Sequence, residues 1–199
     1  DLQARVEGGR LATLLDLARL RPPLAADGRL QGTVAVRGPV GRPQAALNAT
    51  LTEGRLGDHP MPEARLDLAM ADDVVHIREV RARVGEGLVA AAGRVDLQGH
   101  SQFEVGGQGL PFDLLRPVLG TAQPLAGRFD FATQVSGRLA EPEVGISLEV
   151  RDGRVGAVAF DSLVANAFYK DGQFHVEQAL LRKDGHRIKG EGRLPFNPA

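Results

Sequence analysis

The sequence predicts an all-β protein with short helices, folded as an elongated, curved antiparallel sheet with an apolar interior. Apolar and polar residues alternate with period two along most of the chain. Short turn sequences such as EGR, RDGR and KDGQ separate these alternating segments. The whole pattern recurs after 99 residues. Together these features indicate about a dozen meandering strands in two tandem repeats.

The repeat is clearest in one strand and the turn that follows it. GRLQGTVAVRGPVGRP, residues 28–43, returns as GRFDFATQVSGRLAEP, residues 127–142. The shared residues fall at turns and at alternating apolar sites, which is where a common fold constrains a sequence. We therefore expect a first repeat over residues 1–99 and a second over residues 100–199.

Two segments within the predicted strands interrupt the alternation in the same way. Val75 and Ile77 are followed by Val80, one residue out of phase, and Val176 is followed by Ala179. A β-bulge inserts one extra residue into a strand and bends it. The sequence predicts a bulge at both places.

Two segments have helical spacing instead. Leucines and alanines recur at three- and four-residue intervals over residues 11–20, and a shorter version covers residues 110–119. Pro111 suits a helix start, whereas Pro117 limits the length of the second helix. Each repeat is thus expected to be a short helix followed by five or six meandering strands.

Composition excludes several classes of function. Apolar residues make up 43% and charged residues 25%, and the net charge of −1 argues against a nucleic-acid partner. The absence of cysteine excludes disulfides and thiolate sites. No apolar run approaches the roughly 18 residues of a membrane helix. Both ends are interpreted as cuts through a longer protein, so an anchor or address is expected outside this segment.

No catalytic or metal-binding pattern emerges, and neither enzymatic activity nor a cofactor is expected. His76 and His175 recur at equivalent positions, but they lie on the polar face, one in each repeat. Asp72 and Asp73 fit a hairpin turn better than a calcium loop. Arginines at turns and polar faces, such as Arg29, suit a solvated outer surface.

The predicted apolar face is built from small side chains. Ala, Gly, Val and Leu predominate, aromatics are 5% and Trp is absent. A sandwich usually carries bulkier residues between its sheets. The face therefore either curls around an open lumen or packs a dry core, and the composition favours the lumen.

The order of these motifs resembles the periplasmic TamB and AsmA-like proteins of Gram-negative bacteria. Their short LPxxxLL helix is approximated by LPFDLL, residues 110–115, with one residue fewer between LP and LL, and their GxLxGxVxVxGxxxxP strand by the two copies quoted above. LNATLTEGRL with ISLEVRDGRV, and LVAAAGRV with HRIKGEGRL, match the later strands. The resemblance covers essentially the whole chain. One copy departs from it, because GRFDF lacks the second Gly of GRLQG.

The resemblance implies a β-taco or repeating β-groove, apolar inside and polar outside, that bridges the two membranes from an inner-membrane anchor. It implies phospholipids as cargo and an outer-membrane barrel of the TamA type and further repeats of the chain as partners. Moving a sixteen-carbon chain through water costs on the order of 12 kcal/mol, which an apolar groove avoids. The expected groove residues are Leu30, Val34, Val36, Leu47, Leu51, Leu66, Leu68, Val75, Ile77, Phe129, Val135, Ile146, Leu148, Val150, Phe174, Val176 and Ile188.

Two other functions remain open at this level. An exposed sheet edge could template the strands of outer-membrane barrels or autotransporters by strand addition. A dry-cored stalk repeat would bind no ligand. The groove is the preferred hypothesis, since repeating one sheet unit lengthens a conduit without changing its cross-section.

Overall fold

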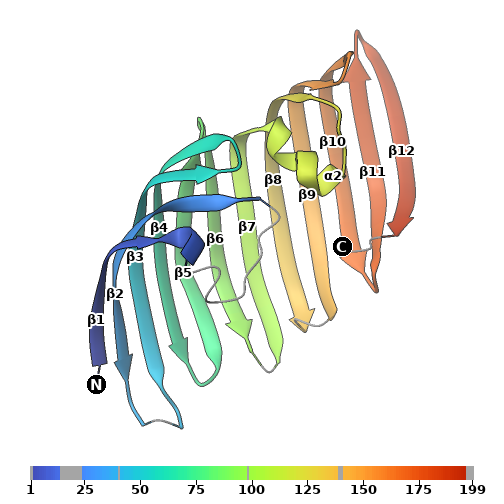
Figure 1. Ribbon diagram of the computed structural model, residues 1–199. Helices are drawn as coiled ribbons and strands as arrows, with labels where there is room; N and C mark the ends of the chain where they lie inside the picture. Colours follow the sequence, from blue (N-terminus) through green and yellow to red (C-terminus); the bar gives the residue numbers. More distant parts are fainter. Residues whose placement is uncertain (1, 14–23, 40, 98, 139–140, 196–199) are drawn as a thin grey trace. The chain divides into compact units, whose positions relative to one another are not determined.

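The computed structural model describes residues 2–13, 24–39, 41–97, 99–138 and 141–195. The chain divides into two units, Asp1–Gln98 and Gly99–Ala199. Strands account for most of the described residues in both units, and every strand pair within a unit is antiparallel. The strands are curved (Figure 1). The predicted all-β class with short helices and a curved antiparallel sheet is confirmed.

The first unit is a six-stranded meander in which each strand pairs with the next. Its strands are β1 (Leu2–Arg10), β2 (Ala26–Arg37), β3 (Gln44–Leu56), β4 (His59–Ala71), β5 (Val74–Val84) and β6 (Gly87–Asp96). Residues 11–13 are helical and follow β1, so a strand precedes the helix that the sequence places first, and the rest of the helix expected over 11–20 lies outside the described residues.

The second unit repeats this order, with two short helices between its first and second strands. Its strands are β7 (His100–Pro111), β8 (Leu125–Arg138), β9 (Glu141–Val155), β10 (Val158–Lys170), β11 (Gln173–Lys183) and β12 (His186–Pro195). The helices are the 3₁₀ helix η1 (Phe112–Leu115) and α2 (Arg116–Leu119). The bounds of β10, β11 and β12 lie 99 residues after those of β4, β5 and β6.

The helical segment expected over 110–119 covers residues 112–119, since Leu110 and Pro111 still belong to β7, and its prolines explain its form. Pro111 is the N-cap of η1, in an extended conformation. Pro117 lies in the first turn of α2, where a missing N–H costs little. Gly120 ends α2 in the left-handed conformation, with φ of 58°. The segment is therefore split into two single turns.

Both predicted bulges are present. The register shifts between Ile77 and Val80 where β5 pairs with β6, and between Val176 and Ala179 where β11 pairs with β12. The extra residue restores the following apolar side chains to the original face. The change of phase in the sequence is therefore a local feature of a continuous strand.

A second type of bulge explains why Gly-Arg begins the repeated strand. The register shifts between Asp27 and Arg29 in β2 and between Ala126 and Arg128 in β8, around glycines with positive φ. A Cβ on Gly28 would lie 2.9 Å from the Cα of Gly54. The backbones of adjacent strands approach so closely here that only glycine fits.

Candidate functional site

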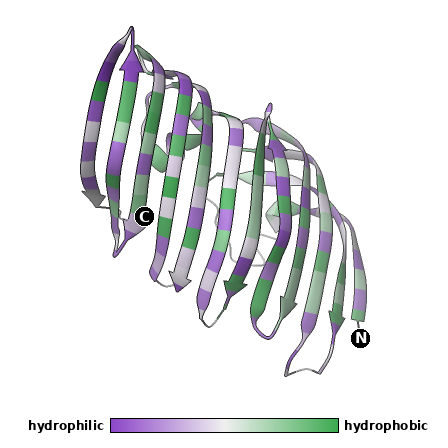
Figure 2. Ribbon diagram, turned by 180° about the vertical axis from the view of Figure 1, so that it is seen from behind, coloured by the Kyte–Doolittle hydropathy of each residue, from purple (hydrophilic) through white to green (hydrophobic). Residues whose placement is uncertain are grey.

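One face of each unit is apolar because the alternating residues of neighbouring strands lie opposite one another. Directly paired residues of antiparallel strands project from the same face. The register therefore arranges the apolar side chains in four rows that cross the strands, called rows A to D here. Figure 2 shows the underlying alternation as hydrophobic and hydrophilic bands along the strands.

In the first unit the rows follow from the pairing of β1 through β6. Row A is Leu30, Leu51, Ala64, Ala82 and Val89; row B is Gly32, Ala49, Leu66, Val80 and Ala91; row C is Ala4, Val34, Leu47, Leu68, Ile77 and Gly93; row D is Leu2, Val36, Ala45, Met70, Val75 and Val95.

In the second unit the equivalent rows follow from the pairing of β7 through β12. Row A is Leu110, Phe129, Val150, Leu163, Leu181 and Ile188; row B is Gly107, Phe131, Leu148, Ala165, Ala179 and Gly190; row C is Val105, Thr133, Ile146, Ala167, Val176 and Gly192; row D is Phe103, Val135, Val144, Tyr169 and Phe174.

Burial is greatest where row A crosses β2 to β4 in the first unit and β7 to β9 in the second. Leu30 and Leu51 in the first unit are 6% and 1% exposed, and Phe129 and Val150 in the second are 4% and 0% exposed. In rows C and D of the second unit, by contrast, the apolar side chains of β8 to β11 are only half-buried. Each apolar face thus has a packed end and an open end.

In the second unit, η1 forms part of the packed end. Its Phe112 and Leu114 are 3% and 6% exposed. The Phe112 ring meets the Phe160 ring edge-on, with centroids 6.4 Å apart. Leu110 and Leu125 are buried in the same unit. The helical turns therefore lie against one end of the apolar face (Figure 1).

All the groove residues expected from the sequence lie in these rows. Four of them, Leu30, Leu51, Phe129 and Val150, are buried in row A and act as core residues. Ile188 is 62% exposed, on β12. The other twelve are half-buried: Val34, Val36, Leu47, Leu66, Leu68, Val75, Ile77, Val135, Ile146, Leu148, Phe174 and Val176.

Several members of the face were not singled out from the sequence. Phe131, Val144 and Tyr169 all belong to the rows of the second unit. Val144 and Tyr169 continue the alternation of recognised strands, so the period-two pattern was a sufficient signal. Phe131 differs from the motif, because it stands where the first copy, GRLQG, has its second Gly.

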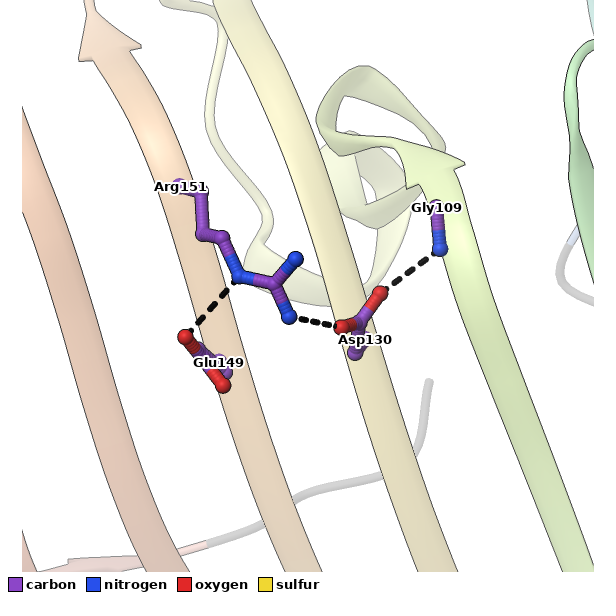
Figure 3. A network of polar contacts seen from close by, with 4 residues as sticks. All are labelled: Gly109, Asp130, Glu149 and Arg151. Carbon is purple, nitrogen blue, oxygen red and sulfur yellow. Dashed lines mark hydrogen bonds and ion pairs between the residues drawn. The ribbon is translucent and has the colours of Figure 1, made fainter.

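On the polar face of each unit, ion pairs join neighbouring strands close to the glycine bulges of β2 and β8. In the second unit, the backbone N–H of Gly109 donates to Asp130 Oδ1 at 2.6 Å, and Arg151 contacts both Asp130 and Glu149 (Figure 3). In the first unit, Arg10 binds Asp27 instead. Each arrangement joins neighbouring strands beside a register shift, which indicates a structural role.

These contacts shift the pKa values of the groups involved. The hydrogen bond from Arg10 and that from the Gly28 N–H lower the pKa of Asp27. Glu149 and Asp130 raise the pKa of Arg151. Glu143, whose carboxylate lies 2.7 Å from the Lys170 ammonium, raises the pKa of Lys170. All of these shifts favour the charged forms, as expected for ion pairs and not for an acid–base catalyst.

An open hollow of about 700 Å³ lies in the second unit, over β7 to β11. Small residues, among them Gly106, Ala132 and Gly145, contribute to its lining, as do Gln134 and Glu104, which are hydrogen-bonded to each other at 3.3 Å. Its lining also includes Val105, Thr133, Ile146 and Ala167 of row C, and Ile146 is one of the groove residues expected from the sequence. The apolar rows form an open face.

The equivalent histidines differ in their surroundings. His175 stacks on Phe168, with ring centroids 4.6 Å apart, whereas His76 is exposed. Among the described residues, no group of three or more His, Cys, Asp and Glu side chains is placed to hold a metal ion. The described part of the chain also has no helix long and apolar enough to cross a membrane.

Comparisons with protein-family models, curated proteins and solved structures found no match to this chain.

Proposed function

We propose that this chain is a segment of a periplasmic bridge that shields phospholipid acyl chains on its apolar face during their passage between the inner and outer membranes. The observation that carries the proposal is the set of half-buried apolar residues in rows B to D of both units. These side chains offer a continuous apolar surface within each unit, packed at one end and open at the other. The motif order that resembles TamB and AsmA-like proteins supports the same function.

The surface chemistry suits a mobile chain better than a fixed ligand. Aliphatic side chains solvate methylenes without directional bonds, so a tail can slide while its headgroup stays in water. Covering one methylene is worth about 0.8 kcal/mol, which makes coverage of a tail favourable without any specific contact. The proposed role requires no catalytic group and no cofactor.

The proposal is tested by placing a charge on the apolar face. Leu148→Lys puts an ammonium among half-buried apolar side chains, where an unpaired charge is costly and repels acyl chains. We expect it to abolish uptake of fluorescent phospholipid from vesicles, and Val34→Asp to do the same in the first unit. Ser147→Lys, on the neighbouring exposed position of β9, is the matched control and keeps uptake. Equal uptake by a folded Leu148→Lys variant contradicts the proposal.

The sheet edge favours one alternative function. Among the described residues of the second unit, β12 pairs only with β11, and its Ile188 is largely exposed. Such an edge can add a strand of an outer-membrane barrel by main-chain hydrogen bonding. A strand-adding scaffold would tolerate Leu148→Lys in a barrel-assembly assay and lose activity when β12 is deleted.

A further inference from the structure

The hollow of the second unit has one wall that ends in two stacked rings. Phe168 on β10 and His175 on β11 are directly paired, and their rings lie face to face, with centroids 4.6 Å apart and an interplanar angle of 2°. Phe168 lines the hollow and is half-buried. The distance between the rings is close to the spacing of adjacent strands, about 4.8 Å. His175 therefore covers one face of the Phe168 ring, and the other face is directed toward β9, on the opposite side of β10.

The position next to this ring on β9 carries no side chain. Gly145 pairs directly with Phe168 on one side and with Gln134 of β8 on the other. A Cβ on Gly145 would have nothing within 4 Å. The Gln134 side chain donates to Glu104 of β7, at 3.3 Å, on the side away from Gly145. Since β8 and β10 are two strand spacings apart, about 10 Å, a slot one ring wide lies over Gly145.

The edges of this slot are polar. Ser147 and Asn166 are directly paired two residues further along β9 and β10, and both line the hollow together with Glu104 and Glu177. The row C residues of the lining alternate with these positions along the strands, so the slot lies on the face opposite to the apolar rows. It thus combines one apolar ring face with amide, hydroxyl and carboxylate groups.

The first unit has alanines at the positions that form the slot. Ala46 pairs with Ala35 on one side and with Ala69 on the other, in the register that joins Gln134, Gly145 and Phe168 in the second unit. His76 pairs with Ala69, so the recurring histidine has no ring opposite it there. The slot is therefore a feature of the second unit and not of the common strand order.

We propose that the slot binds a pyranose ring of a glycan, with one C–H face of the sugar against Phe168 and its hydroxyls bonded to the polar groups at the edges. The face of an aromatic ring is electronegative and attracts C–H groups. Sugar hydroxyls both donate and accept hydrogen bonds, which matches a lining of amides, a hydroxyl and carboxylates. The aromatic side chain of a peptide would fill the slot but leave those groups without partners. This inference goes beyond the proposed function, since it concerns the other face of the sheet.

The test is saturation-transfer NMR on the whole chain with two soluble probes, cellotetraose and N-acetylchitotetraose. We expect transfer to at least one of them, strongest at the C–H protons of one ring face. Phe168→Ala removes the stacking surface, and Gly145→Leu fills the slot while leaving the Phe168 ring in place, so both should lose the signal. Ala46→Leu makes the equivalent addition in the first unit and should keep it. Circular dichroism verifies that each variant is folded.

Absence of transfer to both saccharides overturns the inference. A signal that survives Phe168→Ala and Gly145→Leu also overturns it, because the sugar would then bind elsewhere. Transfer to a short tryptophan-containing peptide that both substitutions abolish, without transfer to either saccharide, would assign the slot to a protein partner instead. None of these results affects phospholipid uptake, so the proposed function stands or falls separately.

Discussion

Gly127 shows how a single residue sets the form of the repeated strand. Its φ of 115° is unfavourable for any residue with a side chain, and a Cβ would lie 2.7 Å from the carbonyl oxygen of Asp152. Backbone atoms cannot move aside as a flexible side chain can. The recurrence of Gly at positions 28 and 127 is therefore a requirement of the bulge and the close approach of two strands.

Gly127→Ala is expected to lower the free energy of unfolding by about 1–3 kcal/mol, because it combines an unfavourable φ with a backbone clash. The change is measured by urea denaturation followed by circular dichroism. Gly145→Ala is the control, since a Cβ at Gly145 would have nothing within 4 Å, and we expect a change within about 0.5 kcal/mol. Equal effects of the two substitutions would contradict this account of the bulge.

Asp27 gives the first unit a pH-dependent contribution to stability. Its folded-state pKa is lowered by Arg10 and by the Gly28 N–H, so the carboxylate stabilises the fold above its unfolded-state pKa of about 3.9. That contribution is lost as the pH falls through the lower, folded-state pKa. As the pH is lowered below about 4, the urea concentration at the midpoint of unfolding should therefore fall less steeply for Asp27→Asn than for the parent chain. Asp72→Asn, at an exposed turn, controls for the loss of one charge, and identical acid profiles for all three proteins would refute the contribution.

Residue types alone predicted the glycines at turns and bulges but not the side-chain contacts between strands. The recurring glycines indicated turns or bulges, because glycine tolerates backbone conformations that other residues avoid. The contact of the Phe131 ring with Gly107 was beyond prediction, since it depends on the pairing of β7 with β8. The Asp130–Arg151 contact likewise joins β8 and β9 through a register that the sequence does not state.

At the level of elements, period-two alternation predicted the strands because one face of each sheet is apolar. It also located the bulges in β5 and β11, because an inserted residue leaves a change of phase in the sequence. The helix near residue 110 was predicted from leucine spacing, but its division into η1 and α2 depends on Pro117. Burial was harder to predict, since the same alternation describes both the buried Val150 and the half-buried Ile146.

The helical segment of the second unit is expected to contribute to stability mainly through Phe112. Phe112→Ala removes a ring that is 3% exposed and in contact with Phe160, which should cost about 3–5 kcal/mol of unfolding free energy. Val118→Ala, on the exposed side of α2, should change stability by less than about 0.5 kcal/mol. Thermal or urea denaturation measures the stability of both variants and distinguishes the two substitutions. A small effect of Phe112→Ala would mean that η1 does not close the apolar face.

At the scale of the whole chain, the two units share strand order, bulges and an apolar face that is packed at one end. Such a surface suits a long, uniform and sliding ligand, because coverage by aliphatic groups is additive along a chain and independent of sequence or headgroup.

The central claim is that the apolar rows hold phospholipid tails, and native mass spectrometry of the gently purified chain tests it most directly. Bound species are then extracted into organic solvent and identified. The account predicts phospholipid bound to the parent chain and to Ser147→Lys, and its loss from Leu148→Lys. A ligand-free mass for the parent chain, with no uptake of added labelled phospholipid, would contradict the account and show that the rows pack a dry core.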